Sequence, residues 1–453
     1  GITDEKRASE TSRLGRTKRY AAPLTKERIC HAPGGKVFRD VHLSIPTQSC
    51  TKERGSDIPS QERDGVFLFA VTEQARADLW TGGKLHEQRE FRIPRSDSHF
   101  FGDNQIQKLG AELAKHGSRV LLIYGSERLK STPLYASILE QVKSAGLTLF
   151  EMGGVEPNPR HTTVDRAAGI CRDKNIDVLL AVGGGSVSDC CKVISAQAKL
   201  DEDIWEMQYT KHTLPTKFIP LGTIVTVFGT GSEMNNGAVI THEEKKIKGA
   251  LWGAQADFAF FDPSYTLSVP MKQVISGAFD TLSHAMETYF GKPDENNLSD
   301  DINEAVMRSV IRNIRVLLAD PENYDARSEL VWASAMAENG VLKIGKVTDF
   351  QCHQIEHQLG AYTNCNHGAG LAVIHPILYR HIYKSGAARF ARWAKNVWGI
   401  TPKDSDEETA IAGIDALAAF IKEIGLPTSF TELGIPADTD FRAIADSTNI
   451  TAD

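Results

Sequence analysis

Five residues in the second half of the chain have the types and the spacing of a metal site. Asp280 and His284 are four residues apart, His353 and His357 are also four apart, and His367 follows ten residues later. Residues i and i+4 share one face of a helix, so each pair can direct two ligating atoms to one point. Imidazole with carboxylate suits Zn(II) or Fe(II). The set predicts a metal site, in which one histidine can be a proton carrier instead of a ligand.

A glycine-rich turn follows an apolar run of buried-strand type, Val178–Val182. Glycines let the main chain approach a diphosphate, and the start of the next helix supplies free N–H groups and a partial positive charge. The turn lacks the G-x-G-x-x-G spacing, so it also fits a plain strand-to-helix turn. The candidate nucleotide-binding residues here are Gly183, Gly184, Gly185, Ser186 and Asp189.

A second candidate region follows the run Phe218–Leu221. Thr223 and Thr226 would lie near the carboxyl end of this predicted strand, where ligands of open α/β sheets bind. Each hydroxyl can contact a ligand or cap the following segment.

Between about residues 118 and 262, short apolar runs alternate with helical stretches. This alternation is the signature of βαβ units, so we expect a Rossmann-like parallel sheet with helices on both faces. The predicted strands are Val120–Tyr124, Leu147–Met152, Val178–Val182, Phe218–Leu221 and Phe258–Phe261, and the predicted helices are Leu139–Ala145, Thr163–Lys174 and Ser186–Leu200.

After Pro263 the pattern becomes helical and no further strand is predicted. An α/β region followed by an all-helical one leaves a cleft between them, which is a favoured place for ligands. The predicted helices are Lys272–Tyr289, Glu304–Leu318, Ser328–Gly340, Asp349–Leu359, Ala387–Val397 and Glu408–Ile424.

The composition is that of a globular protein with a small-molecule ligand. The 453 residues are 41% hydrophobic and 24% charged, and the formal charge of -7 argues against nucleic acid as a partner, because its binding normally requires a basic surface. No apolar run reaches the roughly eighteen residues that a membrane-spanning helix needs. The seven cysteines contain no CxxC pair, which favours reduced thiols and a soluble cytoplasmic protein.

Several linked motifs resemble those of the iron-containing (group III) alcohol dehydrogenases. Glu156-Pro-Asn-Pro159 adds a likeness to the NAD(P)-dependent butanol dehydrogenase branch, and the resemblance runs from about Phe91 to Ile450. The motifs are Gly183-Gly-Gly-Ser186 with Asp189, Gly229-Thr-Gly-Ser-Glu-Met-Asn235, Asp280-x-x-x-His284-x-x-Glu287, and the stretch from Gly345 through His353 and His357 to Asn366-His367-Gly-Ala-Gly-Leu371.

The resemblance implies a nucleotide-binding α/β domain followed by a helical domain, an architecture shared with dehydroquinate synthase. It implies hydride transfer between NAD(P)(H) and a small aliphatic alcohol or aldehyde such as butanol or butanal, by a homodimer or higher homo-oligomer. His357 would lie beside the nicotinamide and relay a proton. One divalent ion, Fe(II) or Zn(II), would be held in the cleft by Asp280, His284, His353 and His367.

The choice of cofactor depends on the turn after the first predicted strand, which the resemblance places near the adenosine ribose. The turn contains Gly125, Ser126, Glu127 and Arg128. An acid hydrogen-bonds a 2′-hydroxyl and favours NAD, whereas Arg128 with Ser126 can accept a 2′-phosphate and favours NADP. We expect NADP to be preferred.

The substrate pocket and the ligand surroundings leave alternatives open. Glu287, three residues after His284, can orient that histidine or face solvent. No arginine that would bind a carboxylate stands beside the candidate ligands. The aromatic residues near the motifs, which can form an apolar pocket or plain core, are Phe228, Trp252, Phe350 and Tyr362.

Residues 1–90 have no counterpart in the resemblance. They are rich in Thr, Ser, Arg, Lys and Glu, and only Val66–Val71 could form a strand, so we expect a loosely ordered extension without a catalytic part. The division of the chain is then 1–90 for the extension, 91–270 for the dinucleotide-binding domain and 271–453 for the helical metal-binding domain.

Two other functions compete with the dehydrogenase. One is an NAD- and metal-dependent synthase or lyase of the same superfamily, which would need a phosphate-binding set of Lys, Arg and Asn around the metal. The other is a non-catalytic or impaired truncated relative that binds nucleotide without turnover, since relatives usually continue beyond the position of Asp453.

Overall fold

The computed structural model describes residues 98–293, 296–348 and 350–448, which all lie in one compact unit. The predicted extension 1–90, its strand Val66–Val71 and the predicted helix start at Asp349 lie outside the described residues. No helix within the described part of the chain has both the length and the apolar character needed to cross a membrane.

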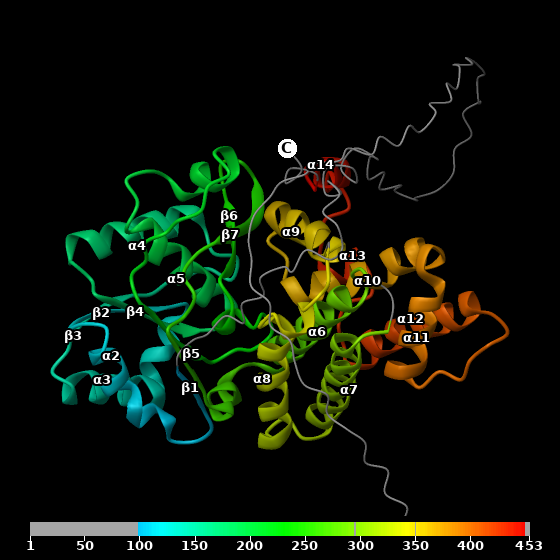
Figure 1. The fold of residues 1–453 in the computed structure, drawn as a ribbon, viewed down its shortest axis with the longest axis horizontal. Helices are drawn as coiled ribbons and strands as arrows, with labels where there is room; N and C mark the ends of the chain where they lie inside the picture. The colour runs from blue at the N-terminus through cyan, green and yellow to red at the C-terminus, as the bar shows by residue number, and fades with distance from the viewer. Residues whose placement is uncertain (1–97, 294–295, 349, 449–453) are drawn as a thin grey trace, which may run out of the picture. The chain divides into compact units, whose positions relative to one another are not determined.

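Six parallel strands form the central sheet, in the order β1-β8-β5-β4-β2-β3. The Rossmann-like α/β fold predicted from the alternating pattern is confirmed (Figure 1). The strands are β1 (Ser98–Phe101), β2 (Arg119–Tyr124), β3 (Thr148–Met152), β4 (Val178–Gly183), β5 (Leu221–Val225) and β8 (Phe258–Phe261).

Both faces of the sheet are covered, because alternate side chains of its strands enter two different cores. From β2, Leu121 and Ile123 pack with residues of α4 (His161–Asp173) and α5 (Gly185–Gln197). Val120 and Leu122 pack on the opposite face with residues of α2 (Leu109–Ala114) and α3 (Pro133–Ser144). Figure 1 shows these helix pairs on the two sides of the strands.

The strand order reverses between β2 and β4. The chain runs from β2 through α3 to β3 on one side, and from β4 through α5 toward β5 on the other. A crevice therefore opens at the carboxyl ends of β2 and β4, which is where open α/β sheets bind ligands. The glycine turn follows β4 at this point, and the turn that begins at Gly125 follows β2.

The structure differs from the predicted strands in three places. The terminal strand β1, Ser98–Phe101, was not predicted. The strand expected at Phe218–Leu221 lies three residues later, as β5 (Leu221–Val225). Pro220 stands just before it, and Gly222 and Thr223 pair with β4 as part of the strand. The antiparallel hairpin of β6 (Gly237–His242) and β7 (Ile247–Trp252) was not predicted. Its four connecting residues, 243–246, are Glu-Glu-Lys-Lys and carry no Asn-Gly or Asp-Gly turn signal.

The remainder of the described chain after β8 is helical, as predicted (Figure 1). One long helix, α10, is absent from the predictions, because it is apolar on nearly all sides and contains Pro376. The helices are α6 (Met271–Tyr289), α7 (Leu298–Ala319), α8 (Tyr324–Glu338), α9 (Gln351–Thr363), α10 (His367–Ile382), α11 (Ala387–Trp398), α12 (Asp406–Glu423), α13 (Phe430–Leu433) and α14 (Phe441–Ser447).

Candidate active site

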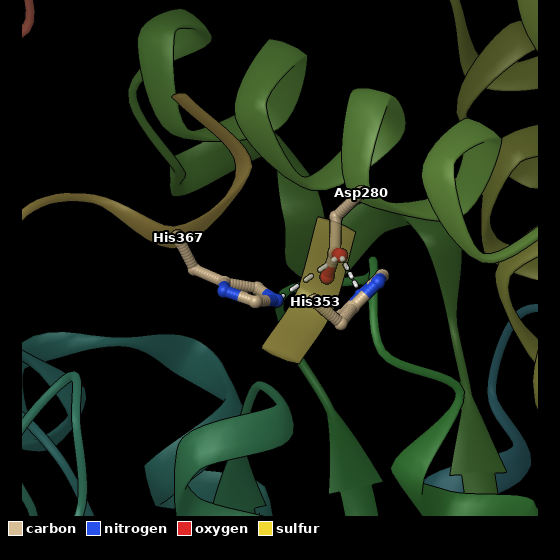
Figure 2. Close-up of side chains that lie close together, drawn as sticks. All are labelled: Asp280, His353 and His367. Atoms are coloured by element: carbon tan, nitrogen blue, oxygen red, sulfur yellow. Dashed lines mark ion pairs between the residues drawn. The ribbon is translucent and has the colours of Figure 1, made fainter. Parts of the chain in front are cut away.

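The structure brings the predicted aspartate together with three of the histidines. Oδ1 of Asp280 lies 3.5 Å from Nδ1 of His284, 3.4 Å from Nε2 of His353 and 3.4 Å from Nε2 of His367. Figure 2 shows the rings of His353 and His367 pointing at the Asp280 carboxylate from opposite sides. One ligand atom from each of Asp280, His353 and His367 lies within 4.8 Å of the other two.

Two glycines allow close helix contacts that fix the positions of the helices carrying these side chains. A Cβ at Gly277 on α6 would lie 2.2 Å from the main-chain oxygen of Phe228, and Asp280 is one turn further along the helix. A Cβ at Gly368 on α10 would lie 2.2 Å from the oxygen of Ser276. Since His367 is the first residue of α10, this second approach brings its ring against α6.

Glu287 holds α9 and its histidine in place. Its carboxylate accepts hydrogen bonds from the main-chain N–H groups of Cys352 (2.6 Å) and His353 (3.1 Å). Both belong to the first turn of α9, where N–H groups have no acceptor one turn earlier in the helix. It also contacts Nδ1 of the His353 ring. Glu287 is buried, so of the two roles considered from the sequence it has the orienting one, but its histidine is His353 and not His284.

Glu356 plays the corresponding part for His367. Its Oε2 contacts Nδ1 of the His367 ring and lies 3.2 Å from Nζ of Lys248. With both Nδ1 atoms facing carboxylates, the Nε2 atoms of His353 and His367 point at Asp280 and have a lone pair available.

The atoms that face the common point lack hydrogen-bond partners. Among the described residues, Oδ1 of Asp280, Nδ1 of His284 and Nε2 of His353 are buried without one. Unpaired buried polar atoms are costly, and a bound cation would satisfy all three. The residues therefore fit a divalent metal ion.

The charges around this point also fit a cation. Three buried carboxylates, Asp280, Glu287 and Glu356, contact the imidazoles, and one ammonium, Lys248, offsets one of them. If the imidazoles bind an ion in their neutral form, two negative charges remain, which one divalent ion matches. Without an ion, burial lowers the pKa of His353 and of His367, but the neighbouring carboxylates outweigh it and raise both, that of His353 to about 10. Burial alone would raise the pKa of Asp280, but the imidazoles of His284 and His367 hold it well below its ordinary value.

The histidines open into a cleft of about 1670 Å³ that reaches from the helical region to the carboxyl ends of β2 and β4. His357 lines the cleft, and its ring centroid is 5.9 Å from that of His353 and 5.6 Å from that of His367. Burial, with Lys248 as the next cause, lowers the pKa of His357 well below its ordinary value. Its imidazole is therefore neutral near pH 7.

Most of the predicted nucleotide-binding residues line the same cleft. A Cβ at Gly185 would lie 2.2 Å from Oγ1 of Thr230, so the turn packs too tightly for a side chain there. Asp189 is engaged by the protein itself, accepting from Ser232 Oγ (2.5 Å) and from the N–H of Val239 (2.8 Å). The lining residues from the predicted set are Gly125, Ser126, Gly183, Gly184, Gly185, Ser186, Asp189 and Thr226.

Two predicted residues do not line the cleft. Thr223 lies inside β5 and is completely buried. The Glu127 carboxylate accepts a hydrogen bond from Tyr124 Oη (3.0 Å) and pairs with Lys130 at 3.2 Å, whereas Arg128 does line the cleft. Of the aromatic residues considered for the substrate pocket, Phe228, Trp252 and Phe350 line the cleft and Tyr362 does not.

Sequence reasoning missed Glu356 and Lys248. Glu356 has a detectable signal, because it lies three residues after His353 on the same helix face. Lys248 has none, since its position depends on the unpredicted hairpin.

Comparison with known proteins identifies the family of the chain. The family model for iron-containing alcohol dehydrogenase matches residues 96–263, and the model for the C-terminal part of the Fe-containing alcohol dehydrogenase family matches residues 274–452. A probable NADH-dependent butanol dehydrogenase 1 of Bacillus subtilis is 40% identical over 350 residues, covering 76% of this chain and 90% of that protein. The NADPH-dependent aldehyde reductase YqhD of Escherichia coli is 35% identical, covering 74% of this chain and 87% of its own.

A solved structure shares the fold. The crystal structure of NADH-dependent butanol dehydrogenase A from Thermotoga maritima has a TM-score of 0.76 and 33% identity, covering 80% of this chain and 90% of that one. These matches agree with the motifs and with the architecture described above. The chain belongs to the iron-containing alcohol dehydrogenase family, in its butanol dehydrogenase-like branch.

Proposed function

We propose that this NAD(P)- and metal-dependent oxidoreductase interconverts a small aliphatic aldehyde, such as butanal, and its primary alcohol. The observation that carries the proposal is the set of unpaired buried atoms of Asp280, His284 and His353 facing one point of a cleft that also contains the glycine turn after β4. A hydride donor and an electrophile can meet in such a cleft.

The metal ligands in this proposal are Asp280, His284, His353 and His367, with Fe(II) or Zn(II) as the ion. When bound, a divalent ion supplies Lewis acidity that polarises a carbonyl group. The protein's own task is orientation. Glu287 and Glu356 hold the Nδ1 side of two imidazoles, which fixes the direction of the opposite nitrogens toward the cleft.

His357 is proposed as the proton relay. It lines the cleft next to the candidate ligands, and its neutral imidazole can accept a proton at one ring nitrogen and release one from the other. His357 is not one of the four proposed metal ligands, so its ring is available for this role.

We further propose that NADP is preferred over NAD. Ser126 and Arg128 line the cleft, while Glu127 is engaged by Tyr124 and Lys130. This arrangement offers a cation and a hydroxyl to a 2′-phosphate and turns the acid away from it.

The substrate in this proposal is uncharged. Among the described residues that line the cleft, Arg128 is the one arginine, and it lies at the nucleotide end. The two lysines closer to the histidines are paired with carboxylates, Lys248 with Glu356 and Lys343 with Glu338. The cleft therefore lacks the phosphate-binding set that a synthase or lyase would need, and intact candidate ligands do not favour the non-catalytic alternative.

A homodimer or higher oligomer in the cytoplasm remains part of the proposal. Phe101, the last residue of the terminal strand β1, and Trp332 form an exposed aromatic pair, which is consistent with a surface that another copy of the chain covers. The five described cysteines form no disulfide with one another, which fits a reducing compartment. Light scattering of the purified protein would measure the assembly.

The decisive experiment follows NADPH and NADH absorbance with butanal, using protein stripped of metal and reloaded with Fe(II) or Zn(II). We expect turnover only after reloading, and its loss in H353A. If neither loaded form oxidises either cofactor with any small aldehyde, the proposed function is wrong. Elemental analysis of the protein as purified identifies the ion.

A further inference from the structure

The β6–β7 hairpin inserts one charged side chain beside the candidate metal ligands. Lys248 on β7 is buried, and its Nζ lies 3.2 Å from Oε2 of Glu356, whose side chain is completely buried. The main chain is fixed as well, because Nε2 of Gln358 on α9 donates to the oxygen of Lys248 at 3.0 Å. The hairpin and α9 are thus joined at this residue.

Glu356 contacts both Lys248 and a histidine. The same Oε2 atom that faces Lys248 contacts Nδ1 of His367, and Oε1 lies 3.8 Å from the thiol of Cys365. The carboxylate therefore links the hairpin to the ring whose other nitrogen faces Asp280.

The two carboxylate–imidazole pairs of the site are stabilised differently. Glu287 receives two main-chain N–H groups from the start of α9 in addition to the His353 ring. Glu356 receives no main-chain N–H in the described structure, and besides the His367 ring its partner is the ammonium of Lys248. Lys248 therefore stabilises the Glu356 carboxylate, as the N–H groups at the start of α9 stabilise that of Glu287. Without it, a buried carboxylate would be left without compensation and would move toward water.

We propose that Lys248 is a positioning residue that fixes the orientation of the His367 imidazole through Glu356. The inference rests on the proposed function, because it takes His367 to be a metal ligand. Removing the lysine would let Glu356 leave the His367 ring, and the ring would lose its fixed direction toward Asp280.

The test uses Co(II) as a spectroscopic probe of the full-length protein. Co(II) affinity is measured by competition with a chelator, and the visible d–d bands report ligand geometry. For K248M we expect an altered spectrum and Co(II) affinity about tenfold or more below wild type, the range found when groups that orient metal ligands are removed. K248R, which keeps the charge, should retain more affinity than K248M.

The sign of the effect separates positioning from simple charge. A lysine that acted only through its positive charge would repel the cation, so its removal would tighten Co(II) binding. Tighter binding in K248M, or an affinity and spectrum equal to wild type, overturns the proposal. The matched control is K245M, because Lys245 belongs to the same hairpin and pairs with a carboxylate, Glu206, but is exposed. It should leave the spectrum unchanged.

A second variant covers the case in which K248M does not fold. In the double variant K248M/E356Q the neutral amide oxygen can accept from Nδ1 of His367 and needs no cation beside it. We expect it to fold and to bind Co(II) with a spectrum closer to wild type than any soluble K248M. A folded double variant whose Co(II) spectrum is no closer to wild type than that of K248M would contradict the role given to Glu356. Failure of wild type to bind Co(II) would instead refute the proposed function.

Discussion

Gly368, the second residue of α10, lies so close to Ser276 on α6 that a Cβ atom there would be 2.2 Å from the Ser276 main-chain oxygen. Ser276 also donates from Oγ to Oδ1 of Asn366 (2.5 Å), and the same amide oxygen caps α10 by accepting from the N–H of Ala369 (3.1 Å). The position of His367 at the start of α10 is therefore set by contact with the helix that carries Asp280.

We predict that Gly368→Ala impairs the site and destabilises the protein. The added methyl group meets main-chain atoms that cannot turn aside, and overpacking of this kind costs about 1–3 kcal/mol. Urea unfolding measures the loss, and Co(II) titration measures the displaced His367. The control is Gly169→Ala in α4, where a Cβ would meet nothing within 4 Å. It should raise the free energy of unfolding by roughly 0.5–1 kcal/mol, since Ala is the better helix former.

Helical spacing predicted only that Asp280 and His284 share one helix face and that His353 and His357 share another. The grouping of Asp280, His284, His353 and His367 into one set was implied by the family resemblance. The partners of the imidazoles could be predicted less well. Glu287 was considered for His284, yet it caps α9 and holds His353, a relationship between two helices that no local pattern encodes.

The nucleotide side shows the same limit. The alternation of strands and helices predicted the sheet and the turn after β4. Thr223 was expected just after the carboxyl end of a strand but lies inside β5, because the strand begins three residues later than its apolar run indicated. The β6–β7 hairpin was not predicted, because its turn, 243–246, has no glycine or asparagine. The position of Lys248 beside the site depends on this hairpin and was therefore not predicted either.

Metal removal should lower thermal stability. A ligand that binds the folded state alone adds about 2.7 kcal/mol at a free concentration about 100 times its Kd. Differential scanning calorimetry of chelator-treated protein should give a lower Tm than the same sample after Zn(II) is restored. In H353A the Zn(II)-dependent rise should shrink or vanish. An equal rise in wild type and H353A would place the bound Zn(II) elsewhere.

Arg128→Ala should change the cofactor preference. Arg128 lines the cleft, whereas Glu127 is engaged by Tyr124 and Lys130. Loss of a hydrogen bond to a charged group costs about 1.5 kcal/mol or more, so the KM for NADPH should rise about tenfold or more. The KM for NADH, measured with the same variant, serves as the control and should change little. A parallel rise for both cofactors would show that Arg128 contacts a part that they share.

Acid should destabilise the protein through His375. This buried ring links Ser283 Oγ (2.6 Å) to the thiol of Cys352 (3.2 Å), and burial lowers its pKa to about 4. Because the unfolded chain binds a proton near pH 6.5 and the folded chain does not, the contribution to stability is complete above about pH 6.5 and is lost as the pH falls toward about 4. Urea unfolding at about pH 7.5 and about pH 5 should therefore show wild type losing more stability than H375Q, which has no ring to protonate.

The exposed His381 provides the comparison, since H381Q should lose as much stability as wild type over the same interval. If the difference between wild type and H375Q stays constant from about pH 7.5 to about pH 5, His375 does not titrate as its burial requires.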